Sequence, residues 1–227
     1  MAGNIVRDID DAVKIRHVLC SVSDKTGLDE LIPALVEINP DARIFSTGGT
    51  FDAIRKILGE RSARHLTQVS DYTGQPETQG GLVKTLDFKI YLGLLTETYN
   101  PAHQRDLERT RAVPIDLVVV NLYPFQQTVA KPDVTVEMAR ANIDIGGPCM
   151  IRAAAKNYLR VAPVVDPADY PRLVERLRRT GGTLDLALRF ELARKAFAHT
   201  AEYDTAIARY LERLEPEAVR GCYEVRR

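Results

Sequence analysis

The sequence predicts an α/β protein built on a mostly parallel sheet. Short aliphatic runs alternate with helical segments of about 10 to 15 residues, which is the pattern of repeated βαβ units. Residues 115–120, Ile-Asp-Leu-Val-Val-Val, have the branched aliphatic composition of a strand that is buried on both faces. With 227 residues, 45% of them hydrophobic, the chain can bury the core of one large domain.

The elements follow from the same alternation. Strands are expected at residues 17–23, 43–46, 115–120 and 161–165. Helices are expected at about 27–38 and 50–58, and from Asp166-Pro167 to about residue 180. Residues 183–214 form a long helical stretch with one apolar face, which could cover the sheet or meet a partner.

Three further segments depart from this alternation. Residues 68–86 are rich in glycine, threonine and polar residues, and we expect a long loop that is either functional or disordered. The first 16 residues are expected to form an N-terminal extension, and residues 215–227 a tail, both peripheral to a domain at 17–214.

Composition excludes several classes of function. The 31 basic residues balance 31 acidic ones, which argues against a nucleic-acid-binding or membrane-binding surface. No apolar run is long enough to span a membrane, and the N-terminus is too charged for a secretory signal. Three unpaired cysteines favour a reduced, cytoplasmic setting, and with four scattered histidines they make a metal site unfavourable.

Two glycine- and hydroxyl-containing loops follow the first two strands. The first reads Ser23-Asp24-Lys25-Thr26-Gly27, and the second reads Thr47-Gly48-Gly49-Thr50. Free N–H groups at a helix start, a lysine and hydroxyl donors suit an anionic group. Taken singly, each loop could be an ordinary helix cap. Together, at one edge of a parallel sheet, they predict a phosphate site.

Two more segments add polar groups to this edge. Lys84 and Thr85 follow Gly80-Gly81, although a surface lysine beside a glycine turn is an equally good interpretation. Asn121 and Tyr123 follow the aliphatic strand directly, where side chains face the ligand crevice. Asn121 could bind a base or an amide there, and Tyr123 could stack on a ligand or donate a hydrogen bond.

The segment from Ile143 to Asn157 is the most informative one. Asp144 precedes Gly146-Gly147-Pro148, and proline favours the first turn of a helix. Three alanines follow, and then Lys156. We expect the carboxylate, the glycine amides and the lysine to surround one small cavity suited to proton transfer and oxyanion stabilisation. An ordinary capped helix with a solvated lysine is the alternative.

These segments, in this order, resemble the IMP cyclohydrolase domain of the bifunctional purine-biosynthesis enzyme that also carries AICAR formyltransferase. The resemblance runs from about residue 17 to 214, and includes Asn121-Leu122-Tyr123-Pro124-Phe125 and the run Lys195 to Ala201 with Tyr203-Asp204. It implies a methylglyoxal-synthase-like three-layer α/β sandwich with additional C-terminal helices. It also implies a homodimer that needs no cofactor or metal. Because the chain ends where the formyltransferase would begin, we expect a separate AICAR formyltransferase to supply the substrate.

The resemblance implies closure of FAICAR to IMP with loss of water. Lys156 would be the main proton donor, Lys84 and Tyr123 would position the formyl group and base, and Asp144 would accept from the carboxamide N–H. Two neighbouring lysines would lower each other's pKa. The substrate-binding residues implied are Ser23, Asp24, Lys25, Thr47, Gly48, Gly49, Thr50, Leu82, Val83, Thr85, Val120, Asn121, Ile145 and Gly146.

Two positions depart from the family pattern. Leu82 stands in place of an arginine, and Asp87-Phe88 replaces a His-Pro pair. The loss of a bidentate donor and the added negative charge bear on substrate affinity. A non-catalytic nucleotide or phosphometabolite sensor with the same fold is therefore one alternative. A methylglyoxal-synthase-like lyase acting on a triose phosphate is another.

Overall fold

The computed structural model describes residues 5–76 and 84–226. At its centre lies a five-stranded sheet in the order β4-β3-β2-β5-β6, in which every neighbouring pair is parallel. The strands are β2 (His17–Val22), β3 (Arg43–Ser46), β4 (Leu66–Gln68), β5 (Leu117–Asn121) and β6 (Ala162–Val164). The predicted α/β class with a parallel sheet is confirmed.

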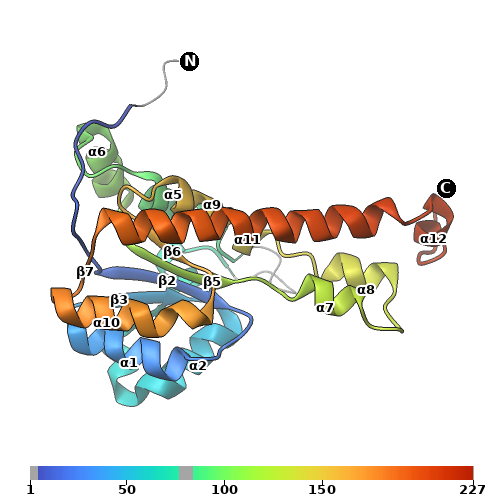
Figure 1. The fold of residues 1–227 in the computed structure, drawn as a ribbon, viewed down its shortest axis with the longest axis horizontal. Coiled ribbons are helices and arrows are strands. Elements are labelled where there is room, and N and C mark those ends of the chain that lie inside the picture. Colours follow the sequence, from blue (N-terminus) through green and yellow to red (C-terminus); the bar gives the residue numbers. More distant parts are fainter. Residues whose placement is uncertain (1–4, 77–83, 227) are drawn as a thin grey trace.

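Helices cover both faces of the sheet and complete three layers (Figure 1). One face carries α1 (Leu28–Ile38), α2 (Gly48–Leu58) and α10 (Tyr170–Thr180), and the other carries α5 (Phe88–Leu95), α9 (Gly146–Lys156) and α11 (Leu186–Glu212). Successive side chains of a strand point to opposite faces, so Val18 and Cys20 belong to one core and Leu19 to the other.

Several shorter elements connect these layers. They are the helical turns η1 (Gly59–Arg61) and η3 (Pro167–Asp169), and the helices α3 (Ser62–His65), α4 (Val69–Thr73), α6 (Pro101–Thr110), α7 (Phe125–Val129), α8 (Val136–Ala141) and α12 (Pro216–Arg220). The helices α4, α5 and α6 and the strand β4 were not predicted. Residues 69–73 of the expected 68–86 loop are therefore helical.

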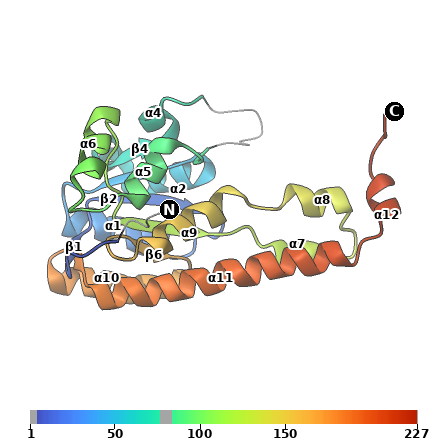
Figure 2. The same cartoon turned by 90° about the horizontal axis from the view of Figure 1, so that it is seen from above.

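The two halves of the long helix α11 have different surroundings. Its first half packs over the sheet, where Ala193 and Ala196 are buried. Its second half continues beyond the sheet beside α7, and α8 lies on the far side of α7 (Figures 1 and 2). At that end the hydroxyl of Tyr223 donates to the carboxylate of Glu137 on α8, so the predicted tail contacts the rest of the chain.

Residues 10–14 of the predicted N-terminal extension pack against the rest of the chain and are not peripheral. Strand β1 (Val13–Lys14) pairs antiparallel with β7 (Thr183–Leu184). The guanidinium of Arg189, which is fully buried, donates to the backbone carbonyls of Asp10 and Asp11. Because these contacts join segments about 170 residues apart, the sequence spacing gave no local signal of them.

Candidate active site

The candidate site lies at the carboxyl edge of the sheet. The loops after β2, β3 and β5 leave the sheet at this edge. The start of α9 lies there too, because a Cβ on Gly147 would meet the side chain of Leu122, the residue after β5, at 2.6 Å. Ligands of open parallel sheets bind outside the carboxyl ends of the strands. Four of the segments singled out by sequence therefore gather in one place.

Asn121 holds the loop after β2. Its side-chain oxygen accepts from the backbone N–H groups of Ser23, at 2.6 Å, and Asp24, at 2.9 Å. Its side-chain nitrogen donates to the carbonyl of Asp24 at 2.8 Å. The oxygen expected to bind a base is thus already used by the chain, so Asn121 fixes the shape of the loop.

Hydrogen bonds between residues of the same loop also fix its conformation. The carboxylate of Asp24 accepts from the N–H and the hydroxyl of Thr26, at 2.9 and 2.6 Å, and these bonds hold the pKa of Asp24 below its usual value. Neither Ser23 nor Thr26 caps α1, which begins after Gly27 in the left-handed region with φ 74°. The ordinary-cap interpretation of this loop is therefore wrong.

Thr50 joins α2 to β2. Its buried hydroxyl donates to the carbonyl of Val22 at 3.0 Å and accepts from the N–H of Val22 at 3.1 Å. A hydroxyl with both functions used within the chain is poorly placed to bind a ligand. The expectation that Thr50 donates to a phosphate is not supported by this geometry.

Two lysines converge on the start of α2. The Nζ of Lys84 lies 3.1 Å from the position that a Cβ on Gly48 would take, and the Nζ of Lys25 lies 4.0 Å from the corresponding position on Gly49. Thr47 precedes the helix as its extended N-cap residue. Two ammonium groups beside a helix start, where the helix dipole is positive, suit an anionic group, and we call this arrangement the anion cradle.

Asp144 lies just before α9. Its Oδ1 accepts from the N–H of Gly147 at 2.9 Å, and its backbone N–H donates to the hydroxyl of Tyr203 at 2.8 Å. Burial raises the pKa of Asp144, and hydrogen bonds from the N–H groups of Gly147, Gly146 and Tyr123 oppose that rise. Within the described residues no cation is among the groups that shift it. A partly buried carboxyl of this kind suits proton transfer.

The other predicted contacts differ in exposure. Tyr123 and Ile145 are 52% and 60% exposed at this edge, whereas Val120 is buried in the core strand and could offer a ligand only its backbone. Thr85 is buried, with its Oγ1 3.0 Å from the position of a Cβ on Gly146. Leu82 and Val83 lie outside the described residues.

Lys156 does not share this site within the chain. It is the exposed last residue of α9, ten residues beyond Gly146. At a rise of 1.5 Å per residue this places it about 15 Å along the axis from the helix start. The expected single cavity holding both Asp144 and Lys156 is therefore wrong for one chain. Lys25 and Lys84 are the pair that converges, instead of Lys84 and Lys156.

Asp87 has a structural role. Its Oδ1 accepts from the N–H of Lys89 at 2.7 Å and caps α5, while its Oδ2 accepts from the side-chain amide of Gln75 at 2.7 Å. The residue is buried. The negative charge that departs from the family pattern is thus stabilised by hydrogen bonds from a helix start and an amide.

A pocket of about 180 Å³ opens beside Tyr123. Its lining includes Leu122 and Phe125 together with His199 and Tyr203 from α11. The Nε2 of His199 is buried and has no hydrogen-bond partner among the described residues, and burial lowers the pKa of His199. Neither His199 nor Tyr203 was predicted to belong to the site. The signal available was the family-like run from Lys195 to Asp204.

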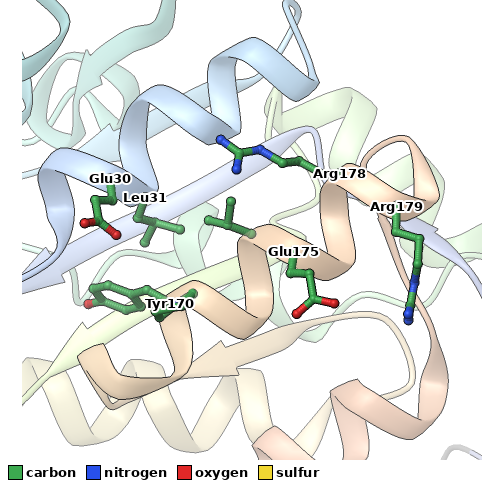
Figure 3. A pocket seen from close by; sticks show the side chains of 8 residues that line it. Glu30, Leu31, Tyr170, Glu175, Arg178 and Arg179 are labelled. Carbon is green, nitrogen blue, oxygen red and sulfur yellow. The ribbon is translucent and has the colours of Figure 1, made fainter.

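A larger hollow lies elsewhere. It has a volume of about 690 Å³ and runs between α1 and α10, lined by Glu30, Tyr170 and Arg178 among others (Figure 3). None of the predicted site residues lines it. Over residues 5–76 and 84–226 there is no cluster of three metal-ligating side chains and no helix able to cross a membrane.

Comparison with known protein families then places the chain. A model of the MGS-like domain matches residues 27–149, and a model described as the AICARFT/IMPCHase bienzyme matches residues 154–226. This chain belongs to the MGS-like domain family. The fold implied by the sequence resemblance is thereby confirmed.

Relatives of this MGS-like chain include bifunctional purine biosynthesis proteins named PurH. The protein from Synechococcus sp. (strain CC9605) is 48% identical over 204 residues, which cover 90% of this chain and 38% of the relative. That from Magnetococcus marinus is 47% identical over 92% of this chain and 38% of the relative. The chain thus spans about 38% of the length of these relatives and is homologous to their IMP cyclohydrolase region.

A solved structure agrees with this assignment. The crystal structure of ForH is 30% identical, with a TM-score of 0.74, and the match covers 85% of this chain and 95% of that one. The fold therefore recurs in a chain that the match covers almost entirely.

Proposed function

We propose that this chain is an IMP cyclohydrolase that closes FAICAR to IMP with loss of water. The observation that carries the proposal is the position of Asp144, a partly buried carboxyl at the start of α9, at the same sheet edge as Tyr123 and an anion cradle. Homology to the IMP cyclohydrolase region of PurH supports the same substrate class.

The reaction needs positioning more than a nucleophilic side chain. The carboxamide nitrogen attacks the formyl carbon of the same molecule, forming the new C–N bond. The former formyl oxygen leaves as water, with one proton from the carboxamide nitrogen and one from the formamide nitrogen. In our proposal Asp144 accepts the proton from the carboxamide nitrogen. The hydroxyl of Tyr123 stabilises the oxygen on which charge develops.

The anion cradle would hold the phosphate of the nucleotide. Lys25 and Lys84 lie at the start of α2, so we place both on the phosphate, with the N–H groups of Gly48 and Gly49. We therefore assign Lys84 to the phosphate, whereas the family resemblance implied that it positions the formyl group. Asn121 supports this cradle by holding the loop that carries Lys25.

Among the residues that the structure describes in one chain, we assign no cation to the formyl oxygen. Lys156 is exposed and about 15 Å along α9 from the candidate site, beyond the reach of its own side chain. We propose that Lys156 serves the site of a second copy of the chain, in the homodimer that the family resemblance implies.

The direct test is to mix the purified chain with FAICAR at neutral pH and follow IMP formation against the uncatalysed rate. Turnover by the wild-type chain, strongly reduced in Asp144→Asn, is the expected result. Tight IMP binding without turnover would contradict the proposal and identify a nucleotide sensor. Release of inorganic phosphate from dihydroxyacetone phosphate would identify a lyase.

A further inference from the structure

Tyr203 on α11 contacts the loop that carries Asp144. Its hydroxyl oxygen accepts a hydrogen bond from the backbone N–H of Asp144 at 2.8 Å and lies 3.5 Å from the carbonyl of Asn142, to which it can donate. The two groups lie on either side of Ile143. One hydroxyl thus bridges the backbone over three residues, from a helix 59 positions later in the chain.

The carboxylate of Asp144 is held from the opposite side. Its Oδ1 accepts from the N–H of Gly147, and a Cβ on Gly147 would overlap Oδ2. The backbone of Asp144 is therefore fixed by α11, while its side chain is fixed by α9. The backbone contact and the side-chain contact together fix the direction in which the carboxyl points.

The ring of Tyr203 is itself fixed. Tyr203 is 8% exposed, and its ring meets that of Phe125 edge-on, with centroids 6.3 Å apart. Phe125 follows the Tyr123-Pro124 turn, so the same packing contact joins α11 to the segment that carries Tyr123. Burial raises the pKa of Tyr203, so the hydroxyl keeps its proton at neutral pH and can both donate and accept.

We propose that Tyr203 is a positioning residue that sets the orientation of the Asp144 carboxyl for proton transfer, acting from the C-terminal helix and without touching the substrate. This inference rests on the proposed function, because it assigns the purpose of the contact to ring closure. It makes α11 a functional part of the site as well as a cover for the sheet.

The chain offers a matched pair of variants. Tyr203→Phe removes the bridging hydroxyl and keeps the ring on Phe125. Tyr210→Phe removes a hydroxyl about two turns further along α11. The ring of Tyr210 also meets that of Phe125 edge-on, with centroids 5.8 Å apart. The readouts are kcat and KM for FAICAR, the pH profile of kcat, and hydrogen exchange at the backbone amide of Asp144.

For Tyr203→Phe we expect kcat to fall roughly tenfold, the effect of one lost hydrogen bond at the reacting group, with KM within about twofold of wild type. The acid limb of the pH profile should move, and the Asp144 amide should exchange faster. Tyr210→Phe should match wild type in all four readouts.

Wild-type kcat and pH profile in Tyr203→Phe would overturn the inference, as would equal effects of both variants. If the wild-type chain does not convert FAICAR, the proposed function fails. The amide exchange rates then still decide whether Tyr203 holds Asp144 in place, because that measurement needs no turnover.

Discussion

At the residue scale, Asn121 shows how one side chain can build a site without binding the ligand. Three hydrogen bonds join its amide to the backbone of Ser23 and Asp24, in the loop that positions Lys25. The sequence predicted a strand ending at Val120, one residue before the observed end at Asn121, but it did not predict the partner of the amide. A residue type and its spacing indicate where a polar group lies, whereas its partner depends on a loop about 100 residues away.

Asn121→Ala should therefore weaken the binding of IMP. Loss of two bonds to loop amides is expected to raise the Kd for IMP roughly tenfold or more, measured by titration calorimetry. Asn100 provides the control, because its side chain likewise accepts from two backbone N–H groups, at the start of α6. Asn100→Ala should leave the Kd unchanged. Equal Kd values in wild type and Asn121→Ala would contradict this role.

At the element scale, the start of α9 was predicted correctly from the sequence, whereas the distance between its two ends was not taken into account. Its start at the Gly146-Gly147-Pro148 run was predicted, because proline and glycine have strong local preferences there. The distance from Asp144 to Lys156 was misjudged. An unbroken helix separates its two ends by its full length, and the spacing of the residues fixed only which face each one occupies.

The start of α9 also gives a sharp prediction. A Cβ on Gly147 would overlap the Asp144 carboxylate and lie 2.6 Å from Leu122, so Gly147→Ala must displace the carboxyl. We expect kcat to fall by about a hundredfold, as for a small misplacement of a reacting group. Gly221→Ala, whose Cβ would come no closer than 3.4 Å to a neighbour, should retain wild-type kcat. Normal turnover in Gly147→Ala would show that the carboxyl need not lie where it does.

At the scale of the whole molecule, the parallel sheet and the gathering of loops at its carboxyl edge followed from local patterns. The packing of the N-terminal segment did not, because β1 pairs with β7 far along the chain and Arg189 binds carbonyls of residues 10 and 11. The role of Thr50 was missed for a related reason. Its hydroxyl joins two elements, a use that no motif distinguishes from ligand binding.

The proposed second copy is tested by mixing two inactive variants. If Lys156 serves the partner's site, Lys156→Ala and Asp144→Asn complement each other, since a mixed dimer contains one site with both groups intact. Statistical mixing of equal amounts predicts roughly a quarter of wild-type turnover. Each variant incubated with itself is the control. No recovery, with mixed dimers verified by mass spectrometry, would contradict a shared site.

The central claim is that Asp144 acts as the base for ring closure, and the pH dependence of kcat tests it most directly. Burial raises the pKa of Asp144, and the charged form is the active one, so kcat should fall as the pH is lowered through a value above the ordinary aspartate pKa of about 3.9. Asp144→Asn should lower kcat by about a hundredfold or more and abolish this acid limb. An Asp144→Asn variant with wild-type kcat, or with the same acid limb, would contradict the account.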